Sequence, residues 1–186
     1  IDGSLKALWI FAEDVVQTDP NTHHVVKAMQ SLDLLVVQEI FMSETAKMAD
    51  VVLPGTTFLE KSGTFTNTER RIQQVNAAVK PLPGTKTDGQ IIVEMMRKLG
   101  FDQPDFDAAE VLKEVSSVVS FFEGVTWEGL GASPMGLQWP VNKKGEDTQI
   151  LHIGEFKRGK GKFHYHDWKE SEELTKHKNE YPFILT

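Results

Sequence analysis

Polar side chains follow three short apolar runs of the sequence, and together they could hold a polar ligand. Asp14 and Thr18 come after the first run, Gln38 ends the second, and Thr56 and Thr57 follow the third. These side chains supply carboxylate, amide and hydroxyl groups, which offer both hydrogen-bond donors and acceptors. If the runs are parallel strands, all of these groups lie at one edge of a sheet, where α/β proteins bind ligands.

The three runs have the composition of buried parallel strands. They are residues 5–11 (LKALWIF), 33–38 (DLLVVQ) and 50–53 (DVVL). Apolar residues at helical spacing follow Asn21 and predict a helix, and a shorter helix is predicted over 44–48. The order strand, helix, strand, helix, strand predicts an α/β fold with a parallel, Rossmann-like sheet, right-handed crossovers and flanking helices.

The regular pattern stops after the third strand and resumes at Asp88. Residues 58–86 lack clear periodicity and end in the loop-forming PLPG segment, so they are predicted to be an inserted excursion. Asp88 is the predicted N-cap of a helix that closes at Gly100, and a further helix is predicted over 108–119.

These patterns predict one α/β domain with an insertion and a carboxyl-terminal segment. Glu170 to Lys178 reads as a charged helix or linker, and YPFILT, residues 181–186, as a strand with nothing after it, which suggests a piece of a longer protein. The predicted α/β domain is 1–57 and 87–122, the excursion is 58–86, and the irregular covering segment that leads to a further domain is 123–186.

Composition restricts the classes of function. The net charge of -7 and pI near 5.4 argue against a nucleic-acid partner, because phosphate binding favours a basic face. No apolar run reaches the roughly 18 residues of a membrane span, so direct membrane insertion is not expected. The absence of cysteine excludes disulfides, thiolate metal sites and a cysteine nucleophile. His164 and His166 share a strand face without a third ligand, so no metal site and no catalytic residue is predicted here.

Five motifs, in order along the chain, resemble the catalytic subunit of molybdopterin oxidoreductases, and formate dehydrogenase alpha subunits most of all. They are AED with Thr18, VVQEIF, TAKMADVVLPG, GTFTNTERRIQ and KTDGQI. The resemblance implies molybdopterin guanine dinucleotide carrying molybdenum or tungsten. It also implies an iron–sulfur cluster held by residues upstream of this chain.

The resemblance places Asp14 and Asp88 at cofactor contacts, with Thr18 and Gln38 as further polar contacts. A carboxylate can accept both N–H groups of a guanine edge. Each residue also has a structural interpretation: Asp88 as a helix N-cap, Asp14 and Thr18 as shaping a loop, and Gln38 as a buried amide that needs partners.

The excursion carries two further candidates. The resemblance places it near the pterin and the cluster-bearing domain, where Arg70 and Asn67 could contact the cofactor or a neighbouring domain. Alternatively, Arg70 belongs to a solvated charge cluster with Glu69 and Arg71.

Two positions depart from the family pattern. Ala12 stands where relatives often have glycine, and Gly89 stands where they often have an aromatic residue.

The resemblance implies that the whole protein oxidises formate to carbon dioxide. Because the metal-ligating and cluster-ligating residues are upstream in the family, this chain by itself is expected to be inactive. The implied partners are the remaining domains of the same chain and electron-transfer subunits. The alternatives are a nitrate reductase catalytic subunit, the large subunit of NADH-quinone oxidoreductase, or a self-standing nucleotide-binding module. The expected compartment is the cytoplasm, with the periplasm as the alternative.

Overall fold

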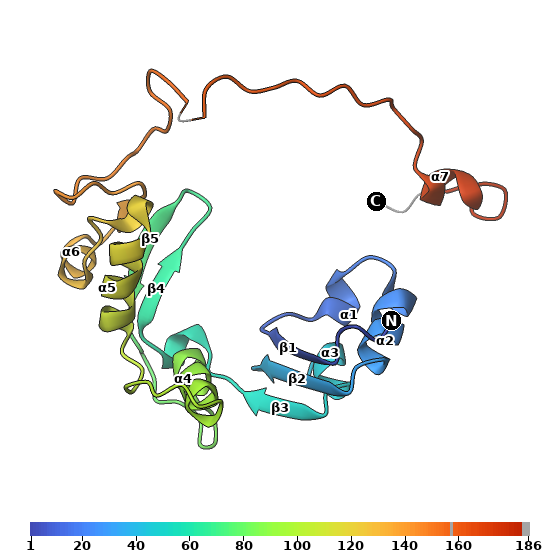
Figure 1. Ribbon diagram of the computed structural model, residues 1–186, viewed down its shortest axis with the longest axis horizontal. Helices are drawn as coiled ribbons and strands as arrows, with labels where there is room; N and C mark the ends of the chain where they lie inside the picture. Colours follow the sequence, from blue (N-terminus) through green and yellow to red (C-terminus); the bar gives the residue numbers. More distant parts are fainter. Residues whose placement is uncertain (157, 184–186) are drawn as a thin grey trace. The chain divides into compact units, whose positions relative to one another are not determined.

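The chain divides into two compact units, Ile1–Gln149 and Ile150–Thr186. The structure is a computed structural model that describes residues 1–156 and 158–183. Figure 1 shows the helices and strands, and the first unit contains both β-sheets.

A parallel sheet of three strands opens the first unit. Its order is β1–β2–β3, with β1 at Ala7–Phe11, β2 at Leu34–Glu39 and β3 at Val51–Pro54. The register sets Gln38 opposite both Phe11 and Leu53, so the carboxyl ends of all three strands share one edge. The predicted α/β class with a parallel sheet is therefore confirmed.

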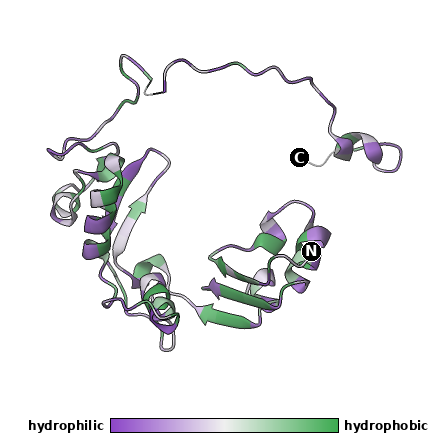
Figure 2. Cartoon of the chain, in the orientation of Figure 1, coloured by the Kyte–Doolittle hydropathy of each residue, from purple (hydrophilic) through white to green (hydrophobic). Residues whose placement is uncertain are grey.

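The helices between these strands close an apolar core against the sheet. They are α1 (Val15–Thr18), α2 (Thr22–Gln30) and α3 (Glu44–Lys47). The core consists of Ile10, Leu35, Val37 and Ala46, with Val15 and Met29 packed against it from α1 and α2. Figure 2 shows that the three strands are the most continuously apolar segments, as expected for strands buried by crossover helices.

The predicted excursion contains a β-hairpin. After the 3-10 helix η1 (Phe58–Glu60), β4 (Gly63–Thr66) and β5 (Arg71–Val75) pair antiparallel, and β6 (Leu137–Gln138) adds to β5. Within these strands only Ile72 is fully buried, among the described residues. A strand is predicted from apolar and polar residues that alternate along the sequence, and a hairpin with one buried side chain lacks that alternation.

A second core forms around this hairpin. It contains Ile72, Leu112, Val125, Leu130 and Val141. Leu112 comes from α5 (Ala108–Val118), and Leu130 from α6 (Trp127–Ala132). The segment predicted to be irregular after residue 122 thus supplies three residues of this core. The elements α4 (Asp88–Lys98) and η2 (Ser120–Phe122) complete the first unit.

The second unit contains a short helix, α7 (Glu172–Lys176), where a charged helix or linker was predicted. Residues 181–183 are not in a strand, and the rest of the predicted terminal strand, 184–186, lies outside the described residues. None of the helices in the described part of the chain has the length and apolar character needed to cross a membrane.

Ala12, directly after β1, adopts the left-handed conformation with a φ of 51°. Its N–H donates to the Gln38 carbonyl at 2.9 Å, which fixes this turn at the carboxyl edge. Left-handed backbone costs a non-glycine residue roughly 1 kcal/mol or more, which explains why glycine suits the position. We expect Ala12→Gly to raise the free energy of unfolding by about 0.5–1 kcal/mol in chemical denaturation. An unchanged or lower midpoint would contradict this account of the turn.

Candidate functional site

Asp14 ties the loop after β1 to the start of α3. Its Oδ1 accepts from the backbone N–H and the hydroxyl of Thr45, at 3.0 and 2.7 Å, instead of capping α1. The buried Thr45 hydroxyl also accepts from the N–H of Val16 at 3.1 Å. The bond from the Thr45 hydroxyl, above all, lowers the pKa of Asp14, so this carboxylate is ionised at neutral pH.

Thr18 lies at the exposed end of α1. Its hydroxyl donates to Glu13 Oε1 at 2.9 Å and to the Asp14 carbonyl at 3.2 Å. These contacts agree with a role in shaping the loop. They also tie the end of α1 to Glu13 and Asp14 in the loop after β1.

Gln38 brings the end of β2 into contact with the start of α4. The residue is 1% exposed, and its Nε2 donates to Asp88 Oδ1 at 2.9 Å. A carboxylate only accepts, so the amide nitrogen must face Asp88 and the amide oxygen is left for another donor. That oxygen is buried and has no hydrogen-bond partner among the described residues. An unpaired buried acceptor costs about 1–3 kcal/mol, which favours a donor from a ligand or from another part of the protein.

Asp88 is not the N-cap of α4, so that prediction was wrong. Thr87 caps the helix: its hydroxyl accepts from the Gln90 N–H at 3.4 Å, and the Gln90 side chain accepts from the Thr87 N–H at 2.9 Å. This reciprocal capping box satisfies the helix start without Asp88. The Asp88 carboxylate instead pairs with Lys61 and accepts from Gln38. We call Gln38, Lys61 and Asp88 the Asp88 cluster.

The end of β3 passes beside this cluster. A Cβ added to Gly55 would lie 3.5 Å from Asp88 Oδ1, and the Gly55 N–H donates to the Glu39 carbonyl at 3.1 Å. The next residue, Thr56, is 2% exposed, and its hydroxyl is unpaired within the part of the chain that the structure describes. Two buried polar groups that have no partner among the described residues therefore lie near the carboxyl ends of neighbouring strands: Gln38 Oε1 within β2 and Thr56 Oγ1 after β3.

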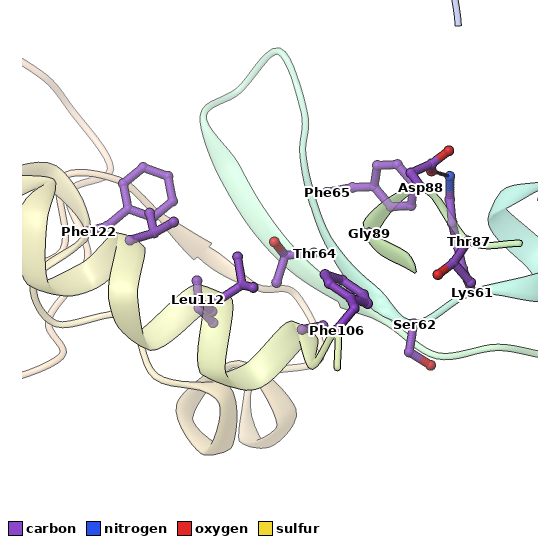
Figure 3. A pocket seen from close by; sticks show the side chains of 14 residues that line it. Lys61, Ser62, Thr64, Phe65, Thr87, Asp88, Gly89, Phe106, Leu112 and Phe122 are labelled. Carbon is purple, nitrogen blue, oxygen red and sulfur yellow. Dashed lines mark hydrogen bonds and ion pairs between the residues drawn. The ribbon is translucent and has the colours of Figure 1, made fainter. Parts of the chain in front are cut away.

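A pocket of about 300 Å³ lies against the cluster (Figure 3). Lys61, Thr64 and Asp88 provide polar groups in its wall, whereas Phe65 and Phe106 provide aromatic rings. Leu112, Val115 and Phe122 extend the apolar part of the wall. The pocket thus combines a charged pair with flat apolar surfaces, a combination typical of small-molecule sites.

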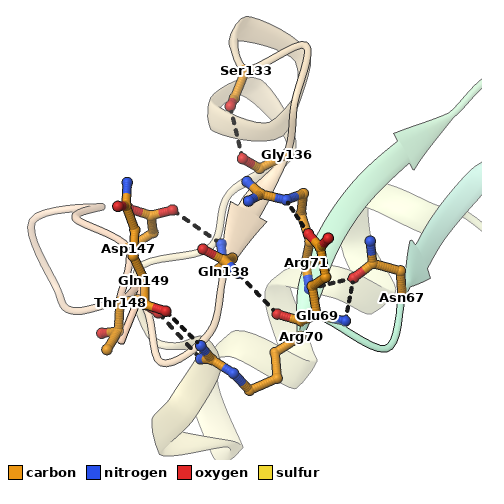
Figure 4. A network of polar contacts seen from close by, with 10 residues as sticks. All are labelled: Asn67, Glu69, Arg70, Arg71, Ser133, Gly136, Gln138, Asp147, Thr148 and Gln149. Atoms are coloured by element: carbon orange, nitrogen blue, oxygen red, sulfur yellow. Dashed lines mark hydrogen bonds and ion pairs between the residues drawn. The ribbon is translucent and has the colours of Figure 1, made fainter. Parts of the chain in front are cut away.

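Asn67 and Arg70 lie elsewhere, in the turn between β4 and β5 (Figure 4). Asn67 shapes this turn: its Oδ1 accepts from the N–H groups of Glu69 and Arg71 at 2.9 and 3.0 Å. No contact among the described residues joins Asn67 or Arg70 to the Asp88 cluster. The structure therefore brings Gln38 and Asp88 into contact, and it places Asp14 and Thr18 in the loop and helix that follow β1. The other two predicted residues lie in the turn of the second sheet.

The half-buried Arg70 fastens another segment to the turn through its guanidinium. It donates to the carbonyl oxygens of Trp139, Thr148 and Gln149, the last two at 3.2 and 3.1 Å. It also lies 5.7 Å from the centre of the Trp139 ring. A guanidinium with its several donors in one plane suits this set of carbonyl groups better than an ammonium would.

We expect Arg70→Ala to loosen residues 139–149. Loss of these charge-assisted bonds should lower the free energy of unfolding by about 1–3 kcal/mol. Hydrogen exchange should speed up in peptides that cover 137–149. Lys143→Ala is the matched control, because that side chain is 84% exposed and lies 4.0 Å from its partner Glu123. Equal exchange in the two variants would mean that Arg70 does not hold the segment.

Three comparisons with known proteins bear on this site. The family model described as molybdopterin oxidoreductase matches residues 1–98, which include the parallel sheet and α4. The F420-dependent formate dehydrogenase subunit alpha of Methanocaldococcus jannaschii is 41% identical, over 98% of this chain and 27% of its own length. The F420-dependent formate dehydrogenase 2 subunit alpha of Methanococcus maripaludis is 43% identical, over the same shares of the two chains.

Among solved structures, acetylene hydratase from Pelobacter acetylenicus matches with a TM-score of 0.57 and 26% identity. The match covers 70% of this chain and 18% of the hydratase. The chain thus spans about a quarter or less of the length of these relatives. Because the relatives are named for different reactions, a match to this portion alone does not specify the reaction.

Proposed function

Because the chain belongs to the molybdopterin oxidoreductase family, we propose that it is part of the catalytic subunit of a formate dehydrogenase. In this proposal it binds molybdopterin guanine dinucleotide along the carboxyl edge of β1, β2 and β3. The observation that carries the proposal is the Asp88 cluster with the buried amide oxygen of Gln38, which has no partner among the residues that the structure describes.

The donors and acceptors at this edge fit the guanosine end of such a cofactor. A guanine edge presents N1–H and N2–H donors, which match the oxygens of Asp88 and the free oxygen of Gln38. The unpaired hydroxyl of Thr56 suits a ribose hydroxyl. Asp14 and Asp88 contribute two negative charges here, and Lys61 contributes one positive charge. The remaining negative charge favours a neutral base over a diphosphate.

The chemistry of the bound cofactor would be oxidation of formate to carbon dioxide at its metal, with electrons passing to an iron–sulfur cluster. The residues of this chain hold the nucleotide end. The described residues contain no group of three side chains that could bind a metal ion, and the sequence has no cysteine. We therefore propose that residues beyond this chain hold the metal and the cluster. Electron-transfer subunits are the proposed partners, in line with the relatives' designation as alpha subunits.

The test is cofactor analysis of a full-length protein that contains this chain. Purified protein should release GMP on acid hydrolysis, contain molybdenum or tungsten, and reduce a dye with formate. Protein with guanine nucleotide and metal but no formate oxidation would reject the substrate and keep the cofactor assignment. Protein with metal but without guanine nucleotide would reject the cofactor assignment.

A further inference from the structure

The aromatic ring of Phe106 covers the backbone directly after Asp88. A Cβ added to Gly89 would overlap the Phe106 ring, so a side chain at position 89 and this ring exclude each other. Glycine in the first turn of a helix is unfavourable by roughly 0.5–1 kcal/mol relative to alanine. Its presence there therefore needs a structural reason, such as the close approach of another group. The approach of Phe106 provides that reason at Gly89.

The same ring forms part of the pocket wall beside the Asp88 cluster. Asp88 and Lys61 lie in this wall together with Phe106, and Phe65 joins them from β4 (Figure 3). Phe106 is half-buried and Phe65 is 47% exposed, so these rings have free surface toward a ligand. A carboxylate and a flat apolar surface thus line one small cavity.

This pairing matches the two kinds of contact that a heterocyclic base makes. Its edge needs hydrogen-bond acceptors, and its face needs a flat partner on which to stack. The geometry points to Phe106 as the residue on which the guanine base stacks while the Asp88 carboxylate accepts hydrogen bonds from the edge of that base. This inference rests on the proposed function. It also accounts for Gly89, because the Phe106 ring from the α4–α5 connection occupies the space that a side chain at position 89 would need.

The test separates a flat ring from apolar packing in the full-length protein. Retained guanine is measured as GMP per mole of protein after prolonged gel filtration, with the melting temperature recorded beside it. Phe106→Tyr keeps the ring and should retain guanine as the wild type does. Phe106→Leu keeps apolar bulk without the flat face, and we expect on the order of tenfold weaker retention.

A double variant tests whether the ring can come from either position. Phe106→Ala should lose guanine as Phe106→Leu does, and Phe106→Ala combined with Gly89→Trp should recover most of it. Equal retention by Phe106→Leu and Phe106→Tyr, or failure of the double variant to recover, would overturn the inference. Asp88→Asn is run in parallel: if it loses guanine while the Phe106 variants do not, the stacking role fails and the proposed function survives. If Asp88→Asn also retains guanine, the proposed function fails with it.

Discussion

Asp88→Asn should reduce cofactor retention on the order of tenfold or more, while lowering the melting temperature by at most a few degrees. Asparagine has the shape of aspartate, but its amide nitrogen would present a donor to the guanine donors. Hydrogen bonds to charged groups contribute about 1.5–3 kcal/mol, so the loss of one is enough for this effect. Stability should change little because Thr87, not Asp88, caps α4. The lost ion pair with Lys61 is part-exposed, and such pairs contribute about 1 kcal/mol or less.

Glu94→Gln is the matched control for this variant. Glu94 is on the same helix and pairs with a lysine, Lys86, at 2.7 Å, but it does not belong to the Asp88 cluster. Its variant should therefore keep the wild-type content of pterin, guanine and metal. Equal cofactor content in Asp88→Asn and Glu94→Gln would remove Asp88 from the proposed site.

Gln38→Leu should lower cofactor retention without destabilising the cofactor-free protein. Leucine has nearly the volume of glutamine and removes an amide oxygen whose burial without a partner costs about 1–3 kcal/mol. Asp88 loses one donor, but it keeps Lys61 and is 25% exposed, so water can replace the amide. The melting temperature of the cofactor-free protein should consequently stay unchanged or rise.

This variant is best measured in two preparations. Protein from cells that cannot make the guanine dinucleotide gives the melting temperature of the cofactor-free form, and protein from competent cells gives the cofactor content. A lower melting temperature of the cofactor-free variant would indicate that Gln38 serves the internal structure. Normal cofactor content in the other preparation would exclude Gln38 from the site.

The parallel sheet was predictable because its strands are continuous apolar runs between turn signals. The helix start at Asp88 was misassigned by one residue, because the neighbouring Thr87 is an equally good cap and has Gln90 three residues later. That shift matters for the proposed site, since Asp88 need not cap the helix and its carboxylate can make other contacts. The family resemblance singled out Asp88, but no sequence pattern indicated that Lys61 is its partner.

Lys61 and Phe106 had no signal in the sequence. Lys61 reaches Asp88 across 27 positions of the chain, and Phe106 reaches Gly89 from the connection between two helices. Both contacts depend on how η1, α4 and α5 pack together, which periodicity does not report. Gly89 was an indirect signal for the Phe106 contact, because a glycine in the first turn of a helix indicates that another group approaches the backbone closely.

The most direct test of the central claim is an experimental structure of the full-length protein with its cofactor bound. The account predicts a guanine edge within about 2.7–3.2 Å of the Asp88 carboxylate and of Gln38 Oε1. A guanine base bound elsewhere, with the oxygen of Gln38 paired to another part of the protein, would contradict it.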